Sequence, residues 1–267
     1  MTEEVADLMP DGRSELKDIC YATEGGIALH LDVLGPEPLP AAPLPTVVRI
    51  DGCPGWGPGD RSSALLPFAN PVLARAGFLT IAISVRHSGQ AVFPAQLDDV
   101  QAALRWVHRN PLGLPIDPGR VGVWGQSAGG HLAALAGLHR SRRTPIHAVV
   151  TISGPSDFLR PGGDLRIDRS SPVTALVGGN VTTHHDQLRA ASPVTHVAAG
   201  APPFLIVHGT ADETVPYEQA ERLHQALLAV GASSRLLPVV GGDHDLRAAR
   251  YDVAHEVVRF FGEVLSG

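Results

Sequence analysis

Residues 121–135 read VGVWGQSAGGHLAAL, an apolar run followed by a tight turn and then by helix-forming residues. The turn, Gly125-Gln126-Ser127-Ala128-Gly129, matches the pattern G-x-S-x-G. A strand, a sharp turn that carries a serine and a helix together make a nucleophile elbow, which exposes the serine Oγ. Glycines at both ends of the turn let strand and helix approach closely and let the serine adopt a strained conformation. The stretch therefore predicts that Ser127 is a nucleophile.

Strand-like and helix-like segments alternate along the rest of the chain. Residues 19–21 and 27–34 flank a Glu-Gly-Gly turn and predict a hairpin, and the proline-rich residues 36–45 predict an irregular connector. Further strands are predicted at 47–50, 78–85, 121–124, 148–152, 204–208 and 235–239, and amphipathic helices at 94–109 and 216–230. This alternation indicates an α/β fold with a mostly parallel central sheet covered by helices on both faces.

The chain has the length of one α/β domain, and we expect a single domain over residues 1–267. One segment interrupts the alternation of strands and helices. Residues 155–201 are rich in Gly, Pro, Ser, Arg and Asp. An excursion of that length in a compact fold is usually functional, so we expect a lid or cap insertion within the domain.

Composition restricts the partners and the compartment. The formal net charge of −6 offers no basic footprint for nucleic acid or for an anionic membrane. No apolar run approaches the length of a membrane span, and the acidic N-terminus lacks the apolar core of a signal peptide. Two cysteines, Cys20 and Cys53, suggest no disulfide framework. We therefore expect a cytoplasmic protein with no nucleic-acid or membrane partner.

An activated serine needs a general base, and that base needs an orienting carboxylate. His244 lies in a glycine-rich loop directly after one predicted strand, and Asp212 occupies the equivalent place one strand earlier. Loops at the carboxyl ends of parallel strands are where such sheets place their chemistry. The order Ser127, Asp212, His244 also matches a known order of nucleophile, acid and base. Glu213 remains an alternative carboxylate, and a helix N-cap remains an alternative role for Asp212.

The other histidines have simpler interpretations. His208 ends a strand, and we expect it to brace the loop that holds Asp212. His131 follows Ser127 by four residues on the predicted helix and is interpreted as a packing residue. In His184-His185-Asp186 the adjacent histidines would face opposite ways in extended structure, and no further ligand stands at a matching spacing. We therefore predict no metal site.

The tetrahedral intermediate needs hydrogen-bond donors for its oxyanion. The elbow supplies the backbone N–H of Ala128, and a second donor is expected from residues 51–56, after an early strand. Pro54 has no N–H, which leaves Cys53 and Gly52 as the expected donors. The thiol of Cys53 is not interpreted as a nucleophile, because no environment that would lower its pKa is visible in the sequence.

Three stretches, residues 93–100 (FPAQLDDV), 116–132 and 201–216, carry a family resemblance. The chain resembles the α/β-hydrolase esterases and lipases, close to the hormone-sensitive-lipase-like esterases and the feruloyl- and acetyl-xylan-esterase-like proteins. The resemblance runs from about residue 45 to the C-terminus. It implies an α/β-hydrolase fold and a triad of Ser127, Asp212 and His244.

The chain departs from this resemblance at three places. Relatives carry a His-Gly-Gly-Gly-like oxyanion loop where this chain has Asp51-Gly52-Cys53-Pro54-Gly55. Loss of one oxyanion donor costs about a hundred- to a thousandfold in rate, so this loop matters. Gln126 stands where relatives usually have an acidic residue. Asp243 and Asp245 flank His244, and two carboxylates beside the imidazole predict a pH optimum that is shifted upward.

The leading hypothesis is a serine hydrolase that cleaves a carboxylic ester of a small or medium-sized molecule without a cofactor. Trp56, Phe93 and residues 155–201 are expected to wall the substrate pocket. An amidase or peptidase with the same triad is one alternative. Another is a repurposed fold that carries out lyase, lactone or isomerisation chemistry, or that only binds a ligand. A homodimer through the C-terminal helix, predicted at 245–265, is a further hypothesis, by analogy.

Overall fold

The computed structural model describes residues 15–58, 69–139, 141–162, 171–180 and 182–265. Within these ranges the strands form one eight-stranded sheet in the order β1-β2-β4-β3-β5-β6-β7-β8. β1 and β2 form the predicted hairpin and β2 pairs antiparallel with β4, whereas every other pair is parallel. The strands are β1 (Glu15–Glu24), β2 (Ile27–Leu34), β3 (Leu44–Asp51), β4 (Leu79–Ser84), β5 (Ile116–Gln126), β6 (Ala148–Ile152), β7 (Phe204–Gly209) and β8 (Ser234–Val239). The predicted fold class is confirmed.

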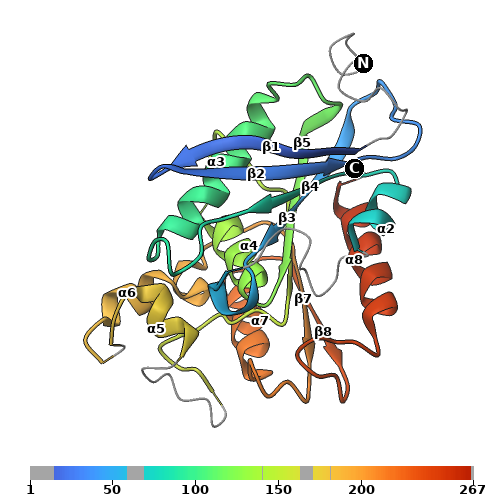
Figure 1. Ribbon diagram of the computed structural model, residues 1–267. Coiled ribbons are helices and arrows are strands. Elements are labelled where there is room, and N and C mark those ends of the chain that lie inside the picture. Colours follow the sequence, from blue (N-terminus) through green and yellow to red (C-terminus); the bar gives the residue numbers. More distant parts are fainter. Residues whose placement is uncertain (1–14, 59–68, 140, 163–170, 181, 266–267) are drawn as a thin grey trace.

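Helices cover both faces of the sheet (Figure 1). One face carries α3 (Ala95–Arg109), α4 (Ala128–Leu138) and α7 (Glu218–Ala229), and the other carries α2 (Ala69–Arg75) and α8 (Arg250–Leu265). Two buried apolar clusters result. Val123 packs into the cluster on the α4 side, and its neighbour Trp124 packs into the cluster on the α8 side. Because successive side chains of a strand point to opposite faces, a strand buried on both sides is expected to be almost entirely apolar.

The proline-rich connector ends earlier than the sequence suggested. β3 begins at Leu44, whose N–H donates to Pro115 O over 2.7 Å, so Pro45 belongs to a strand. The register against β5 shifts between Leu44 and Thr46, and proline is tolerated at such an irregularity because it has no N–H to place in the ladder. The C-terminal helix, in turn, begins at Arg250 and not at residue 245.

Short helices fill the described parts of residues 155–201, the expected lid. They are α5 (Pro172–Val177), α6 (His185–Ala190) and the 3₁₀ turn η2 (Pro193–His196). α5 packs against η1 (Pro54–Trp56), the 3₁₀ turn that follows β3. Residues 163–170 and 181 of this segment lie outside the described residues. The segment therefore lies beside the carboxyl ends of the strands, where the predicted site residues also lie.

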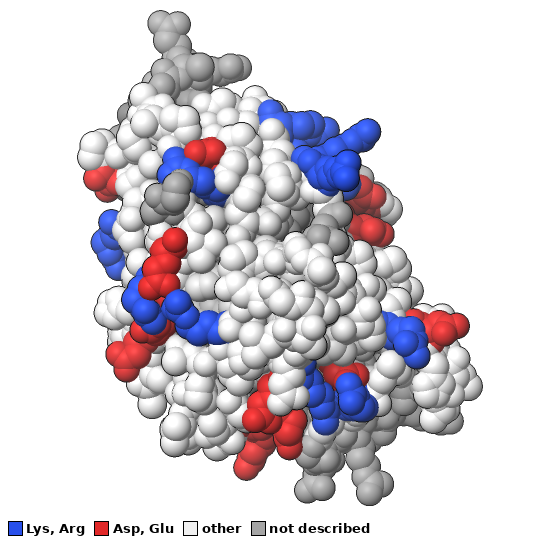
Figure 2. All heavy atoms as spheres, turned by 180° about the vertical axis from the view of Figure 1, so that it is seen from behind, with Lys and Arg blue, Asp and Glu red and all other residues white. Residues whose placement is uncertain are grey.

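Charge is dispersed on the face seen from behind. Acidic and basic side chains lie there in small groups separated by wide uncharged areas (Figure 2). Among the described residues, no helix is both long and apolar enough to cross a membrane.

Candidate active site

Ser127 stands at the junction of β5 and α4 in a strained conformation. Its φ of 53° and ψ of −120° lie in a region that non-glycine residues rarely adopt. A Cβ on Gly125 would lie 2.3 Å from Gly129 C, and a Cβ on Gly129 would lie 2.2 Å from Ile50 O. The Ser127 N–H donates to Ile152 O over 2.8 Å. The glycines of the turn are therefore required by the close approach of strand and helix.

His244 links Ser127 to Asp212. Its Nε2 lies 2.9 Å from Ser127 Oγ, and its Nδ1 lies 2.8 Å from Asp212 Oδ2. An ionised carboxylate can only accept a hydrogen bond, so the assigned tautomer has its proton on Nδ1, which donates to Asp212. Nε2 is then free to accept from the serine hydroxyl. The imidazole is 16% exposed and the carboxylate is fully buried. This arrangement can draw the hydroxyl proton from Ser127.

The loops that carry Asp212 and His244 touch each other. The Ala211 N–H donates to Gly242 O over 3.0 Å, and a Cβ on Gly209 would lie 2.3 Å from that same oxygen. A side chain at position 209 would therefore push the two loops apart. This contact holds residues that are 32 positions apart in the sequence at hydrogen-bonding distance.

Asp212 accepts three hydrogen bonds and has a longer contact to a fourth donor. Oδ1 accepts the N–H groups of Thr214 and Val215 at 2.9 and 2.8 Å. Oδ2 accepts from His244, and the longer contact is to His208 Nε2, which lies 3.2 Å away. Burial by itself raises the pKa of Asp212, but the hydrogen bonds from His208, His244 and Val215 outweigh burial and hold that pKa well below its usual range. The alternative carboxylate, Glu213, is exposed on the pocket wall.

The expected oxyanion loop packs directly on the elbow. A Cβ on Gly52 would lie 2.3 Å from Gly129 N. Ala128 is the first residue of α4, where a backbone N–H has no intrahelical acceptor. The Cys53 N–H, however, donates to Asp51 Oδ1 over 3.1 Å.

A buried ion pair supports this loop, and sequence reasoning missed it. Arg49 Nη2 lies 3.2 Å from Asp51 Oδ2, and both side chains are almost completely buried. Burial lowers the pKa of Arg49, and the nearby Asp51 opposes that effect. The available signal was the presence of two opposite charges, two residues apart, at the end of an otherwise apolar strand.

Trp56 anchors the C-terminal end of the loop formed by residues 51–56. Its Nε1 donates to His131 Nδ1 over 3.2 Å, and His131 Nε2 donates to Ala191 O over 2.7 Å. Phe158 completes the cluster, with its ring centroid 5.7 Å from that of Trp56 and 5.1 Å from that of His131. Burial lowers the pKa of His131 to about 4. The interpretation of His131 as a packing residue is confirmed, and the structure adds a hydrogen-bonding role.

A pocket of about 480 Å³ opens over Ser127. Trp56 lines this pocket, as expected. Phe93 does not; it lines a second hollow of about 350 Å³ beside α6. The Phe93 N–H donates to Leu176 O, which ties its backbone to α5. Residues 155–201 contribute much of the apolar wall, with Pro155, Phe158, Pro161, Pro172 and Val173.

One of the two carboxylates that flank His244 has a basic partner. Asp245 Oδ2 lies 2.6 Å from Arg247 Nη2, so this carboxylate is paired with an arginine. Gln126 donates from Nε2 to His244 O over 3.4 Å, a long contact between the elbow and the histidine loop. The effect of these groups on the pH optimum remains a prediction.

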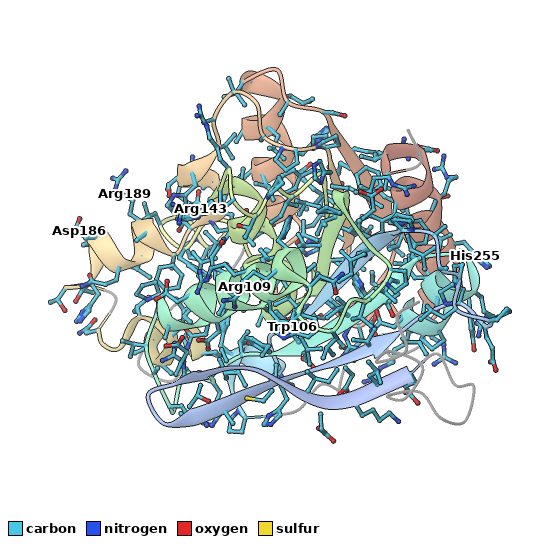
Figure 3. All side chains as sticks on the ribbon, turned by 90° about the horizontal axis from the view of Figure 1, so that it is seen from above. Trp106, Arg109, Arg143, Asp186, Arg189 and His255 are labelled. Atoms are coloured by element: carbon cyan, nitrogen blue, oxygen red, sulfur yellow. The ribbon has the colours of Figure 1, made fainter. Side chains whose placement is uncertain are left out.

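His184 and His185 stand at the start of α6. Asp186 projects outward from α6 at the edge of the molecule (Figure 3). His184 uses its Nδ1 in contacts with Asn180 O and Thr183 Oγ1, at 2.9 and 3.0 Å. In the described part of the chain, no group of three or more His, Cys, Asp or Glu side chains could hold a metal ion.

The chain is similar in sequence to known esterases. The chain is 31% identical to esterase LipC of Mycobacterium tuberculosis over 88% of its own length and 62% of the relative's. It is 33% identical to the probable carboxylic ester hydrolase LipM of the same organism, over 76% and 49% of the two lengths. The chain thus spans only half to three fifths of these curated relatives.

Solved structures share the whole architecture. A truncated carbohydrate esterase from gut microbiota superposes with a TM-score of 0.85 at 27% identity, over 96% of this chain and 98% of that one. The native esterase Est2 of Thermogutta terrifontis superposes with a TM-score of 0.75 at 24% identity, over 94% and 92%, and shows the common fold. The resemblance to α/β-hydrolase esterases is therefore confirmed. Since the BD-FAE family model matches residues 31–227, the chain belongs to the BD-FAE family.

Proposed function

We propose that this protein is a serine hydrolase that cleaves a carboxylic ester of a small or medium-sized molecule through an acyl-enzyme. The observation that carries the proposal is the hydrogen-bonded series Ser127 Oγ, His244 and Asp212 at the base of the pocket. Membership of the BD-FAE family and similarity to mycobacterial esterases support the same reaction class.

The reaction proceeds in two halves. Ser127 Oγ attacks the acyl carbon while His244 Nε2 takes the hydroxyl proton, and the imidazolium then protonates the departing alkoxide as the C–O bond breaks. Asp212 remains ionised throughout and stabilises the imidazolium. Water, deprotonated by His244, attacks the acyl-enzyme, and the released serine recovers its proton.

We assign the oxyanion to backbone N–H groups of Ala128, Cys53 and Gly52. Ala128 is supported by its place at the start of α4, and Gly52 by its packing against the Ala128–Gly129 peptide. The Cys53 N–H donates to Asp51 in the described arrangement, so it reaches the oxyanion only by leaving that carboxylate.

The pocket suits an ester of limited size. A volume of about 480 Å³ lies in the range of small-molecule sites, and Trp56 and Phe158 offer apolar surface beside Ser127. We propose that residues 155–201 act as the lid of one domain that spans residues 1–267. Support comes from the pocket wall that this segment builds.

We further propose that the enzyme works in the cytoplasm on small-molecule esters without a cofactor. The chain has only two cysteines, Cys20 and Cys53, which suggests no disulfide framework and suits a reducing compartment. A homodimer remains a hypothesis by analogy.

The test is labelling with a fluorophosphonate together with turnover of p-nitrophenyl acyl esters and of the matched anilides. Wild type should be labelled at Ser127 and should hydrolyse short acyl esters faster than anilides. Ser127→Ala should abolish labelling and lower kcat by at least about 10⁴-fold. Anilide turnover that equals ester turnover would favour the amidase alternative. If the folded wild type is neither labelled nor active, the proposal is wrong.

A further inference from the structure

His208, the buried histidine near the end of β7, contacts the acid of the proposed triad. Its Nε2 lies 2.8 Å from Val215 O and 3.2 Å from Asp212 Oδ2. Both partners can only accept a hydrogen bond, since one is a carbonyl oxygen and the other an ionised carboxylate. Nε2 must therefore carry a proton, which points to Val215 O and has Asp212 Oδ2 as a second, longer contact.

We propose that His208 is a positioning residue for ester hydrolysis, whose Nε2–H holds Asp212 Oδ2 in the place from which it orients His244. This inference rests on the proposed function, because Asp212 matters only if His244 acts as the base. His208 does not touch the reacting atoms; it acts through Asp212.

The hydrogen bonds of Asp212 divide the work between its two oxygens. The backbone N–H groups of Thr214 and Val215 hold Oδ1. Oδ2 faces His244, and in the described part of the chain His208 is the only other side chain that bonds to it. Without His208, Asp212 Oδ2 would lose the donor that fixes its position relative to His244. The negative charge on Oδ2 would also be less compensated. In metal sites, loss of the partner that orients a ligand costs about ten- to a hundredfold in activity, and we expect a similar scale for the partner that orients Asp212.

Burial alone does not explain an imidazole at this position. Nδ1 of His208 is buried and has no hydrogen-bond partner among the described residues. A buried polar atom without a partner costs free energy, so a leucine or phenylalanine would fill the space at lower cost. The Nε2 contacts are what an apolar side chain cannot supply. Tyr217 packs edge-on against the ring at 6.0 Å between centroids, which restrains the plane of the imidazole.

The charged and titratable groups that surround the pair come from three segments. The loop after β7 carries Asp212 and Glu213, and Tyr217 stands just before α7. The loop after β8 carries His244 with Asp243 and Asp245 on either side, and Asp245 is paired with Arg247. The residue directly after β6 is an uncharged serine, Ser153, whose N–H donates to Val207 O. Removal of one donor from Asp212 therefore changes the field at His244 without changing any other charge.

Three substitutions separate the possible roles of His208. In His208→Gln the amide nitrogen can reach the place of Nε2, in His208→Asn it stays near the place of Nδ1, and His208→Leu has no donor. Each variant is titrated with a fluorophosphonate to count working sites, and kcat, KM and the pH dependence of kcat/KM are then expressed per titrated site. His224→Asn serves as the control, since His224 bonds to Ser234 Oγ on the outer edge of the fold.

We expect His208→Leu and His208→Asn to lower kcat per site about ten- to a hundredfold, with KM changed less than about threefold. The acidic limb of the kcat/KM profile should move to higher pH by about half a unit, because Asp212 then presents more negative charge to His244. His208→Gln should recover most of kcat and the wild-type profile, and His224→Asn should match wild type.

A purely structural role would give a different result. It would lower the melting temperature and the fraction of titratable sites, while kcat per site and the pH profile of the remaining sites stayed unchanged. That result, or a His208→Asn variant as active as His208→Gln, would overturn the inference. A wild type that is not labelled at Ser127 would instead sink the proposed function itself, so the two failures are distinguishable.

Discussion

Trp56 donates its indole N–H to His131 Nδ1 over 3.2 Å, and this bond joins the loop after β3 to the helix that follows Ser127. The loop needs such an anchor. Cys53, Gly55 and Trp56 all have φ between 51° and 58°, a left-handed conformation that costs free energy in the two non-glycine residues. The strain persists because hydrogen bonds at both ends of the loop, at Asp51 and at His131, hold it.

Trp56→Phe should keep an aromatic ring at this position and remove the hydrogen bond to His131 Nδ1. His131 Nδ1 would then be buried without a partner, which costs about 1–3 kcal/mol of stability. We also expect kcat for esters to fall by up to about tenfold, because a less restrained loop presents its N–H groups less accurately. Urea unfolding and ester turnover measure the two effects. Phe158→Leu alters the same cluster and the same pocket wall but leaves the bond intact, so it is the matched control for lost apolar contacts. The loss of kcat should be larger in Trp56→Phe, and equal kcat losses in both variants would contradict this explanation.

His131 should make stability depend on pH. Burial lowers its pKa in the folded protein to about 4, from 6.5 for an unperturbed histidine. The unfolded chain therefore binds more protons between these values. Above about pH 6.5 the ring is neutral in both states and costs no stability. As the pH falls toward 4, the free energy of unfolding decreases by about 3 kcal/mol in total. Unfolding free energies measured from pH 7.5 to 4.5 should fall accordingly. An NMR titration that found the His131 ring protonating near pH 6.5 in the folded protein would contradict it.

Gly52→Ala should separate the oxyanion loop from the elbow. The added Cβ would lie 2.3 Å from Gly129 N and 2.4 Å from Ala128 C, both backbone atoms that cannot move aside cheaply. We expect kcat/KM to fall about a hundredfold or more. Gly262→Ala on α8, where a Cβ meets nothing within 4 Å, is the matched control and should keep full activity. Full activity in Gly52→Ala would mean that the loop plays no part in the reaction.

Asp99→Ala should destabilise the fold strongly, because it breaks the buried ion pair between Arg86 and Asp99. The Asp99 carboxylate is fully buried and accepts from Arg86 Nη2 at 2.6 Å and from the Arg86 backbone N–H at 2.8 Å. Its loss leaves a largely buried guanidinium without its carboxylate, which costs about 3–5 kcal/mol. Thermal and urea unfolding measure the change. Glu263→Ala removes an exposed partner of Arg235 and should leave stability within experimental error; a similar loss in both variants would rule out burial as the cause.

Local patterns were sufficient for much of the fold. The elbow around Ser127 is a contiguous signal, because the glycines, the serine and the flanking strand and helix are neighbours in the chain. Strands buried on both faces are mostly apolar, so their centres could be predicted. Their ends were less certain, and β5 begins at Ile116 where the prediction began at residue 121. The placement of Asp212 and His244 after successive strands followed from a general rule about parallel sheets.

Contacts between segments that lie far apart in the chain could not be predicted from local sequence patterns. The sequence suggested that Phe93 lines the pocket, but its backbone is tied to α5 and its side chain faces another hollow. The Arg49–Asp51 pair and its bond to Cys53 depend on which face of β3 is buried and on how the loop turns afterwards.

Periodicity and spacing along the chain thus determined the α/β class, the elbow at Ser127 and the order of the proposed triad. Which donors reach Asp212, where the Cys53 N–H points and what walls the pocket depended on packing between segments. Hydrogen bonds form over about 3 Å, and a shift of one side chain or one turn of loop exchanges their partners. Such choices are made only when the whole chain has folded, so no stretch of sequence taken by itself contains them.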